Sequence, residues 1–262
     1  MNAPWLNGAP AASALATHRG LHYGDGVFRT CLVAAGEVVL LERQLAHLAR
    51  DAARLDLHGD PAALRREAQS LARGLERGVL KLMLLRAGGE RGYRSKSRDA
   101  DRLLCTYPLP QYPQASRGIR AERANFKLAT QTTLAGIKHL NRLEQVLATR
   151  NIAPGVDEVV LEDAEGRPVC GSRSNLFWVQ GAVAHTPPVE RCGVAGLTRE
   201  RLLEQGARVS EASFEALENA DEMFFTNSLI GIWPVRSFGA RAFGAPGPAT
   251  RQLMAALRHP EL

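Results

Sequence analysis

Residues 133–150, TLAGIKHLNRLEQVLATR, hold one of only four lysines in a chain of 262 residues. Arginine occurs 29 times, so nearly every positive charge on the protein belongs to a guanidinium. The lysine of this stretch, Lys138, stands between Ile137 and His139. A lysine amine can lose its proton and an arginine in a protein does not, so the position suits chemistry that needs a neutral nitrogen.

The residues after Lys138 predict the start of a helix. Asn141 and Glu144 have the spacing of a capping box, and an apolar face follows at helical spacing, formed by Leu143, Val146 and Leu147. We therefore expect Lys138 on a loop or strand end just before a helix N-terminus. Desolvation and the positive end of the helix dipole both favour a neutral amine, which is a nucleophile toward aldehydes. The alternative is a lysine at a loop edge that points into water.

Composition excludes several classes of protein. With 45% hydrophobic residues, the chain can bury one large core or two smaller ones. The N-terminus MNAPWLNGAPAAS does not resemble a signal peptide, and no segment approaches the roughly 20 apolar residues that cross a bilayer. The four cysteines form no C-x-x-C pair, which argues against a zinc site or a disulfide framework: Cys31, Cys105, Cys170 and Cys192. We expect a soluble cytoplasmic protein with no metal site and no membrane contact.

The formal net charge of +6 does not indicate a nucleic-acid-binding protein. The arginines are scattered through helical patterns such as RQLAHLARDAARL, residues 43–55, and no block of like charge occurs. No nucleic-acid-binding motif is present. Solvated helix faces explain the charge better, and a basic surface gives at most a weak preference for small anions.

The pattern of strands and helices divides the chain into two mixed α/β domains with partly antiparallel sheets. We expect a small N-terminal domain at residues 1–108, a proline-rich linker at 109–116 and a larger C-terminal domain at 117–262. In the first half we expect a hairpin at residues 22–44 and helices at 42–57 and 60–77. Two buried strands are expected at 78–89 and 102–110. In this half, Asp60 caps a helix that begins at Pro61.

The second half mixes its elements. We expect three short strands in residues 157–187, a helix at 196–207, a strand at 221–227 and a closing helix at 248–258.

An anion site is indicated in CGVAGLTRERLL, residues 192–203. Gly193 and Gly196 form a turn, after which Leu197 and Thr198 open a helix. Its free backbone N–H groups and the Thr198 hydroxyl make a cradle for an anion. The polar stretch TNSLIG, residues 226–231, ends a strand and can close this cradle through Ser228. The alternative is an ordinary glycine-containing turn with a helix cap.

Four segments together resemble the fold-type IV family of pyridoxal-phosphate enzymes, which includes branched-chain and D-amino-acid aminotransferases. The segments are AGIKHLNRLEQV, HYGDGVF, GVAGLTR and SNLFWV. The similarity extends over nearly the whole chain, and GIKHLNRLEQV is most similar to lyases of the family that release pyruvate from 4-amino-4-deoxychorismate to give 4-aminobenzoate, a folate precursor. The resemblance implies pyridoxal 5'-phosphate bound to Lys138 between a small and a large domain. It also implies a homodimer whose site includes residues from both subunits.

The sequence departs from the family pattern at the phosphate. Relatives carry H-[IL]-x-R-L in the first long helix, and that arginine binds the cofactor phosphate, whereas QLAHLA places His47 there. A histidine offers at most two donors, but a nearby phosphate favours its charged form. Arg43 and Arg50 lie on the same helical face and can substitute. The alternative for His47 is a surface histidine.

A second departure concerns the electron sink. Relatives place a glutamate five residues before the asparagine of NLF, where it pairs with the pyridine nitrogen, but CGSRSN places Cys170 there. A neutral thiol cannot hold that proton by charge pairing. We expect this to disfavour transamination more than a lyase reaction, in which aromatisation of the substrate ring supplies driving force. The alternatives are a small buried cysteine without a role, and a paralogue with weakened cofactor binding.

The substrate of such a lyase carries two carboxylates, so its site should present cations and hydroxyls. Arg86, Arg91 and Tyr93 stand in LLRAGGERGYRSKSR, residues 84–98, and Tyr23 stands beside GDGV. A solvated basic loop is the alternative. We therefore expect a lyase acting on a small dicarboxylate. A fold-type IV aminotransferase and a non-catalytic member of the family are the other two hypotheses.

Overall fold

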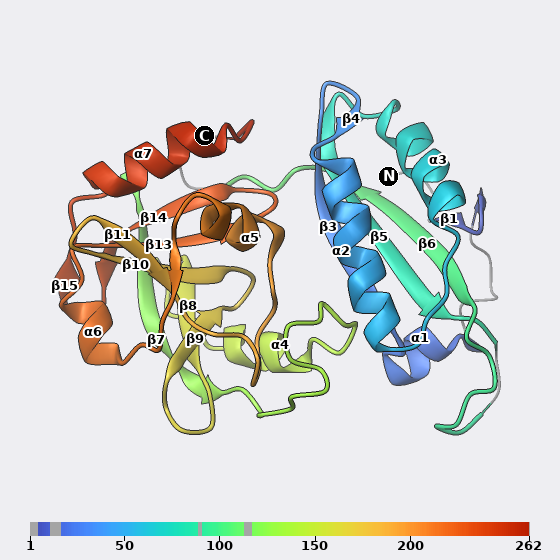
Figure 1. Cartoon of the computed structure of the whole chain (residues 1–262), viewed down its shortest axis with the longest axis horizontal. Coiled ribbons are helices and arrows are strands. Elements are labelled where there is room, and N and C mark those ends of the chain that lie inside the picture. The colour runs from blue at the N-terminus through green and yellow to red at the C-terminus, as the bar shows by residue number, and fades with distance from the viewer. Residues whose placement is uncertain (1–4, 11–16, 89–90, 113–116, 262) are drawn as a thin grey trace. The chain divides into compact units, whose positions relative to one another are not determined.

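The computed structural model describes residues 5–10, 17–88, 91–112 and 117–261. The chain divides into two compact units, Met1–Pro110 with Ile137–Asn141 and Gln111–Gly136 with Arg142–Leu262 (Figure 1). The segment that carries Lys138 therefore belongs to the first unit, although it lies in the second half of the sequence. The expected domain boundaries stay predictions, and residues 113–116 of the expected linker lie outside the described residues.

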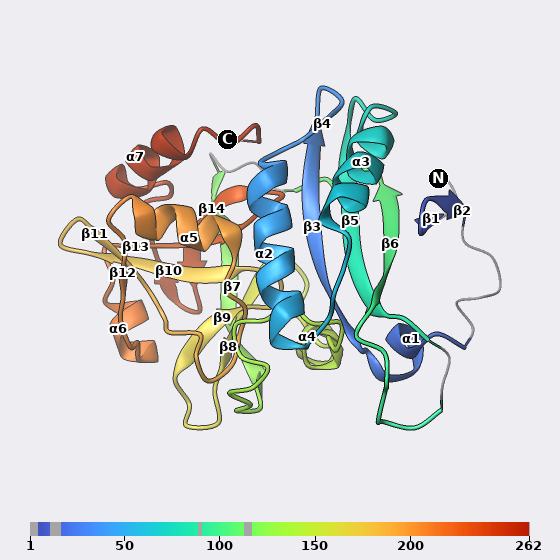
Figure 2. The same cartoon turned by 45° about the vertical axis from the view of Figure 1, so that its right-hand side comes forward.

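The first unit contains an antiparallel sheet with the strand order β2-β1-β6-β5-β3-β4 among its described residues. The strands are β1 (Trp5–Leu6), β2 (Ala9–Pro10), β3 (Gly26–Ala34), β4 (Glu37–Val38), β5 (Arg77–Arg86) and β6 (Ala100–Tyr107). The helices are α1 (Arg19–Tyr23), α2 (Leu41–Arg54) and α3 (Pro61–Ala72). Helices α2 and α3 cover one face of this sheet (Figure 2).

Two periodicities build the core of the first unit. Val27 and Cys31 alternate along β3 and face the helices. Leu45, Leu48 and Ala52 recur along α2 at helical spacing and face the sheet, as predicted. Each fully buried aliphatic side chain of this kind contributes about 1.5–3 kcal/mol to folding. Helix α2 is thereby held against β3.

Helix α3 begins where the sequence predicts. The Asp60 Oδ1 atom accepts hydrogen bonds from the N–H groups of Ala62 and Ala63, both at 3.0 Å. Pro61 occupies the first turn, where its missing N–H costs nothing. The backbone donors, that of Ala63 above all, hold the pKa of Asp60 below its usual range.

The second unit contains a larger mixed sheet. Six of its strands close into a ring in the order β10-β13-β14-β7-β8-β9. The ring closes because β9 pairs with both β8 and β10, the latter through Cys170 and Asn175. Its strands are β7 (Ile119–Lys127), β8 (Glu158–Glu162), β9 (Pro168–Gly171), β10 (Asn175–Gln180), β11 (Val183–Thr186), β12 (Arg208–Val209), β13 (Glu222–Asn227), β14 (Gly231–Phe238) and β15 (Arg241–Ala242). The mixed α/β fold class is confirmed.

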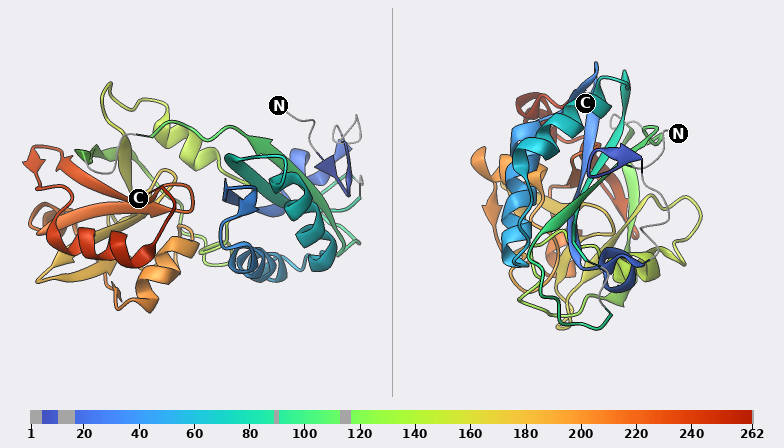
Figure 3. Two further views of the ribbon diagram at one scale, coloured as in Figure 1. Left: turned by 90° about the horizontal axis from the view of Figure 1, so that it is seen from above. Right: turned by 90° about the vertical axis from the view of Figure 1, so that its right-hand side faces the viewer.

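Helices cover both faces of this second sheet. They are α4 (Leu143–Thr149), α5 (Leu197–Glu204), α6 (Phe214–Glu218) and α7 (Pro248–Leu257). Helices α5 and α7 pack on one face and α6 packs on the other (Figures 2 and 3). On the α5 face, the rings of Phe177 and Phe224 stack with centroids 5.0 Å apart. No helix among the described residues combines the length and the apolar composition that a membrane span requires.

The sequence analysis missed strands β7 and β14, and it expected three strands in residues 157–187, where the structure has four. Strand β14 contains Pro234, and a proline argues against a central strand because it cannot donate to the ladder. The structure nevertheless pairs Pro234 with Phe224 of β13. A register shift follows between Val235 and Ser237, so β14 is irregular where it meets β7.

The predicted capping box at Asn141 is wrong. Helix α4 begins at Leu143, its N-cap is Arg142, and no side chain caps it. The Asn141 Nδ2 atom donates to the carbonyl of Gly24 at 3.3 Å, and Glu144 Oε1 accepts from the N–H of Ala129 at 2.8 Å. The expected apolar face is largely exposed, at 67% for Leu143, 56% for Val146 and 37% for Leu147.

Candidate active site

The segment around Lys138 pairs with the first residues of β3. The Phe28 N–H donates to the carbonyl of Lys138 at 2.9 Å, and the Leu140 N–H donates to the carbonyl of Gly26 at 3.0 Å. Val27 and His139 face each other in an antiparallel bridge. Because opposite residues share a face and neighbours alternate, His139 lies on the helix side and Lys138 on the other. Lys138 thus stands on a short added strand, in agreement with the predicted loop or strand end.

The glycines of the GDG motif make room for this segment. A Cβ atom on Gly24, whose φ is +62°, would lie 2.3 Å from the Asn141 Oδ1 atom. A Cβ atom on Gly26 would lie 2.4 Å from the carbonyl oxygen of Leu84 and 2.8 Å from Leu140 Cδ1. A side chain at Gly24 would displace the Asn141 side chain, and one at Gly26 would displace the Leu140 side chain and the backbone of β5.

The amine of Lys138 lies against an aromatic ring. Its Nζ atom is 4.6 Å from the centroid of Phe28, which is 8% exposed. The Nζ atom of Lys81, on β5, lies 4.7 Å from the same centroid. Burial lowers the pKa of Lys81, and the neighbouring Cys105 opposes part of this effect. The two amines therefore lie against the same ring, and both lysines are partly buried.

The sequence analysis gave Lys81 no role. The available signal was a scarce lysine inside the apolar run VLKLMLL, residues 79–85. Lys81 pairs with Thr30 in the β3–β5 ladder, which places it on the same face as Phe28, two residues before Thr30. Among the described residues, no carboxylate forms an ion pair with Lys81.

The backbone of Lys138 is tied to helix α2. Its N–H donates to the Oδ2 atom of Asp51 at 3.0 Å. The same oxygen accepts from Arg29 Nη2 at 2.5 Å, and Arg29 also donates to the carbonyl of His47 at 3.3 Å. Arg29, His47 and Asp51 are 3%, 3% and 7% exposed. The sequence analysis missed both Arg29 on β3 and Asp51 on α2, because charged side chains are usually solvated.

His47 is a buried residue, so the surface alternative for it is wrong. Arg43 and Arg50, the two proposed substitutes, are exposed, whereas the buried cation next to His47 is Arg29. A contact between His47 and a phosphate stays a prediction.

The predicted anion cradle lies in the second unit, in the loop before α5. The Gly136 N–H donates to the carbonyl of Gly193 at 3.1 Å, and the Ala195 N–H donates to the carbonyl of Gly136 at 2.9 Å. The Asn175 Nδ2 atom donates to the carbonyl of Val194 at 2.8 Å. Gly136, two residues before Lys138 in the sequence, is thus part of the cradle loop.

The helix after this loop offers an anion site. Gly196 is the N-cap of α5, without a side-chain cap, and Leu197 and Thr198 begin the helix as predicted. The first N–H groups of a helix have no partner within it and lie at the positive end of its dipole. A Cβ atom on Gly196 would lie 2.1 Å from Asn175 Oδ1. Backbone donors and the Thr198 hydroxyl can therefore hold a phosphate group.

Strand β13 adds a buried hydroxyl beside the cradle. Thr226 pairs with Asn175 and so shares its face of the sheet. Its Oγ1 atom is buried, with no hydrogen-bond partner among the described residues. A buried group left without a partner costs about 1–3 kcal/mol, so a ligand that bonds to Thr226 gains affinity. The sequence analysis gave this residue no role.

Ser228 lies in the turn after β13, and its carbonyl accepts from His259 Nε2 at 3.1 Å. Burial lowers the pKa of His259, which favours the neutral imidazole.

Cys170 lies opposite Asn175 and is 6% exposed. Burial, followed by the proximity of Cys192 and Glu158, raises the pKa of the Cys170 thiol far above its usual range. The thiol is therefore neutral at physiological pH. Glu158 does not replace the missing carboxylate, because its oxygens accept from the Ser172 and Ser174 hydroxyls at 2.5 and 2.8 Å.

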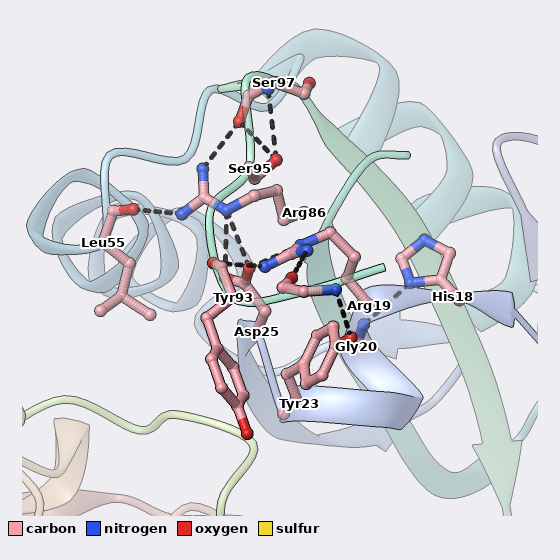
Figure 4. A network of polar contacts seen from close by, with 12 residues as sticks. His18, Arg19, Gly20, Tyr23, Asp25, Leu55, Arg86, Tyr93, Ser95 and Ser97 are labelled. Atoms are coloured by element: carbon pink, nitrogen blue, oxygen red, sulfur yellow. Dashed lines mark hydrogen bonds and ion pairs between the residues drawn. The ribbon is translucent and has the colours of Figure 1, made fainter. Parts of the chain in front are cut away.

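Arg86 is committed to its own unit. Its Nε atom donates to both oxygens of Asp25, at 3.1 and 3.0 Å (Figure 4). Its other nitrogens donate to the carbonyls of Leu55, Asp56 and Ser97. Arg19 also binds Asp25, at 3.1 Å. These bonds occupy all three nitrogens of the Arg86 guanidinium, and a role for Arg86 in substrate binding stays a prediction.

The remaining predicted substrate residues lie beside this network. The Tyr23 hydroxyl accepts from the Gly92 N–H at 2.9 Å, and its ring meets that of Tyr93 edge-on, with centroids 5.5 Å apart (Figure 4). Tyr93 is 90% exposed, and Arg91 is exposed as well. Roles for Tyr23, Arg91 and Tyr93 in substrate binding stay predictions.

The family model for class IV aminotransferases matches residues 26–238. The chain belongs to the class IV aminotransferase family. It is 32% identical to the aminodeoxychorismate lyase of Vibrio harveyi over 251 residues, covering 90% of this chain and 91% of that protein. It is 28% identical to the D-alanine aminotransferase of Bacillus licheniformis, covering 92% and 89%. The crystal structure of 4-amino-4-deoxychorismate lyase from Pseudomonas aeruginosa superimposes with a TM-score of 0.91 at 40% identity, covering 99% and 100%.

Class IV enzymes use pyridoxal 5'-phosphate, and the residues present fit that cofactor. Within the first unit, the Lys138 amine lies beside an aromatic ring and is the kind of nitrogen that reacts with an aldehyde. Within the second unit, the N-terminus of α5 has no side-chain cap, and the buried Thr226 hydroxyl has no partner among the described residues, which suits a phosphate. The Cys170 thiol is neutral, and a pairing between it and the ring nitrogen of the cofactor stays a prediction.

Replacement of Gly196 by alanine tests the cradle. The new Cβ atom must displace Asn175 and with it the carbonyl of Val194. We expect the Kd for pyridoxal phosphate to rise at least tenfold, which corresponds to about 1.4 kcal/mol. Absorbance titration of the apoprotein measures it. Gly244→Ala is the control, because a Cβ atom there meets nothing within 4 Å, and equal affinities of the two variants would contradict the assignment.

Proposed function

We propose that the chain is a pyridoxal-phosphate-dependent lyase that releases pyruvate from 4-amino-4-deoxychorismate and gives 4-aminobenzoate. The observation that carries the proposal is the similarity to the Pseudomonas aeruginosa lyase over the full length of both chains. The Vibrio harveyi lyase supports it with 32% identity over 90% of this chain. The arrangement around Lys138 and Cys170 adds two chemical arguments.

The first argument concerns the residues that hold the cofactor. Lys138 would hold the cofactor through its aldehyde carbon, and Phe28 lies against the Nζ atom on one side. The cradle of Gly196, Leu197 and Thr198 holds the phosphate through backbone N–H groups and a hydroxyl. Ser228, with its carbonyl fixed by His259, completes the cradle.

The chemistry that follows rests on proton transfer by Lys138. When bound, pyridoxal phosphate supplies an electron-withdrawing ring that stabilises negative charge on the carbon bearing the substrate amine. The Lys138 Nζ atom removes the proton from that carbon, C4, as a general base. The C3–O bond then breaks, a C3–C4 double bond forms, and the departing enolpyruvate takes up a proton to become pyruvate. Phe28 limits the access of water to the amine.

The second argument concerns the choice between lyase and aminotransferase. A neutral Cys170 leaves the ring nitrogen without a carboxylate partner, which weakens the electron sink. A transaminase depends on that sink throughout its cycle. The proposed elimination produces an aromatic ring, so part of its driving force comes from the substrate. The arrangement at Cys170 therefore favours the lyase over the amino-acid aminotransferase.

We propose further that Lys81 binds a carboxylate of the substrate. The substrate carries two carboxylates, and Lys81 lies on the same sheet face as Lys138 and against the same Phe28 ring. Its ammonium is half-buried, so an anion that binds it returns part of the solvation lost on burial. The distance between the two Nζ atoms is at most the sum of their distances to the ring centroid. A molecule of the size of the substrate spans that distance.

Finally, we propose that the enzyme is a cytoplasmic homodimer. Helix α4 has no buried residue and exposes Leu143, Val146 and Leu147. Aliphatic side chains gathered on one short helix are typical of an interaction surface. The four cysteines are free, which agrees with a reducing compartment.

Replacement of Lys138 tests the central proposal. Lys138→Ala should abolish the visible absorption band of the holoenzyme and reduce pyruvate release to background. Lys138→Arg should do the same, because a guanidinium keeps the charge and lacks the nucleophile. Borohydride reduction of the wild type should leave the phosphopyridoxyl group on Lys138 in a mass-spectrometric digest. Lys96→Ala, at an exposed lysine, is the control. A visible band that persists in Lys138→Ala would remove the assignment, and equal rates of pyruvate release and keto-acid amination in the wild type would refute the lyase preference.

Replacement of Lys81 tests the carboxylate subsite. A charge-assisted hydrogen bond contributes about 1.5–3 kcal/mol. Lys81→Met should therefore raise KM for the dicarboxylate on the order of 10- to 100-fold, with a smaller change in kcat. Lys81→Arg should restore most of the affinity. Steady-state pyruvate release measures both constants, and a KM unchanged in Lys81→Met would show that the carboxylates bind elsewhere.

The oligomer is tested by light scattering after size exclusion at micromolar concentration. The wild type should have twice the mass of the chain, and Val146→Asp should shift it toward the monomer by placing a charge on α4. Val209→Asp, on an exposed strand residue, should leave the mass unchanged. A monomeric wild type would contradict the dimer.

A further inference from the structure

We infer that the buried pair of Arg29 and Asp51 is a positioning device for Lys138. Its catalytic meaning rests on the proposed function, but its geometry does not. All the contacts lie within the first unit, between β3, α2 and the segment that carries the lysine.

The geometry makes Asp51 the meeting point of three elements. Its Oδ2 atom accepts from Arg29 Nη2 at 2.5 Å and from the Lys138 N–H at 3.0 Å. The backbone ladder between residues 138–140 and β3 ends here, because the N–H of Lys138 turns to Asp51. The position of the Lys138 Cα atom is thereby set by a side chain of α2.

Arg29 fixes the carboxylate that does this. Its guanidinium bonds to Asp51 Oδ2 and to the carbonyl of His47, one turn earlier on α2. The side chains of Arg29 and Asp51 are 4% and 10% exposed. Asp51 therefore cannot rotate away from Lys138 without breaking its buried ion pair with Arg29.

The energetics also favour a positional role. Removing two charges from water is expensive, and an apolar pair of the same shape often stabilises a fold at least as well. The core residues Val27, Leu48 and Ala52 on the same two elements are apolar. A buried ion pair in such a place gives directional hydrogen bonds that an apolar pair does not give.

The pair also balances the electric field at the amine. The Asp51 carboxylate attracts a proton to the Lys138 Nζ atom and the Arg29 guanidinium repels it, so the two charges oppose each other. Other titratable or charged groups stand on the same elements: Glu42, Arg43, His47, Arg50 and Arg54 on α2, Cys31 on β3, Arg77, Lys81 and Arg86 on β5, and His139 beside the lysine. None of these changes in the variants below, so each shift reports on the pair alone.

The charge balance is tested in the apoprotein by reductive methylation with ¹³C-formaldehyde, followed by NMR of the Lys138 signal across pH. Asp51→Asn leaves Arg29 unopposed, so the pH midpoint of the Lys138 signal should fall by about one unit. Arg29→Met leaves Asp51 unopposed, so the midpoint should rise by a similar amount. The double variant Arg29→Met/Asp51→Asn should return to the wild-type value. A pair with a purely structural role would leave all four midpoints equal, and that result would overturn the inference.

A second comparison holds even where a single variant does not fold, because neither protein in it carries an unpaired charge. Arg29→Met/Asp51→Asn keeps an acceptor for the Lys138 N–H, whereas Arg29→Met/Asp51→Leu has none. We expect faster hydrogen exchange at the Lys138 amide in the leucine variant. We also expect slower pyruvate release, on the order of 10- to 100-fold, as for a displaced catalytic group. Equal exchange in the two proteins would overturn the inference.

The two hypotheses fail separately. Opposite midpoint shifts in a protein that releases no pyruvate would uphold the pair and refute the lyase. Pyruvate release in a protein whose Lys138 midpoints do not shift and whose variants exchange equally would uphold the lyase and refute the positioning role of the pair.

Discussion

Backbone pairing between residues 138–140 and the start of β3 is the constraint on which the site depends. Two hydrogen bonds hold the segment against Gly26 and Phe28, and the strand alternation then sends Lys138 and His139 to opposite faces. The GDG motif follows from the same contact, since Gly24 and Gly26 lie where a Cβ atom would meet the segment or its neighbours. The lysine motif and the glycine motif are therefore two halves of one packing arrangement.

Much of the fold could be read from the sequence, because its signals are local. Asp60 before Pro61, the apolar stripe of α2 and the glycine turn before α5 each act within a few residues. The capping box failed because Asn141 and Glu144 found partners elsewhere, namely the carbonyl of Gly24 and the N–H of Ala129. A partner 117 residues away leaves no trace in a local pattern. Strand β14 was missed for the same reason, since the pairing of Pro234 is visible only once β13 lies beside it.

The site was predictable where one residue type carries the chemistry, as at Lys138 and Thr198. It was not predictable where two ordinary residues act together. Arg29 and Asp51 are each unremarkable in the sequence, and their meaning comes from a 2.5 Å contact between a strand and a helix. Thr226 is similar, because its hydroxyl attracts notice only when burial leaves it without a partner among the described residues. Cys170 is the opposite case. The sequence shows a cysteine where relatives have a glutamate, but only the structure shows that the thiol is buried and therefore neutral.

The assignment of Ile137–Asn141 to the first unit bears on how the protein can be dissected. A recombinant fragment that stops at Pro110 keeps every strand of the first sheet yet loses the five residues that pair with Gly26 and Phe28. Its β3 then presents bare N–H and C=O groups along an apolar edge, which is a template for association with other chains. A fragment that ends at Pro110 is thus prone to aggregate. A soluble fragment needs residues 137–141 supplied as a tethered peptide.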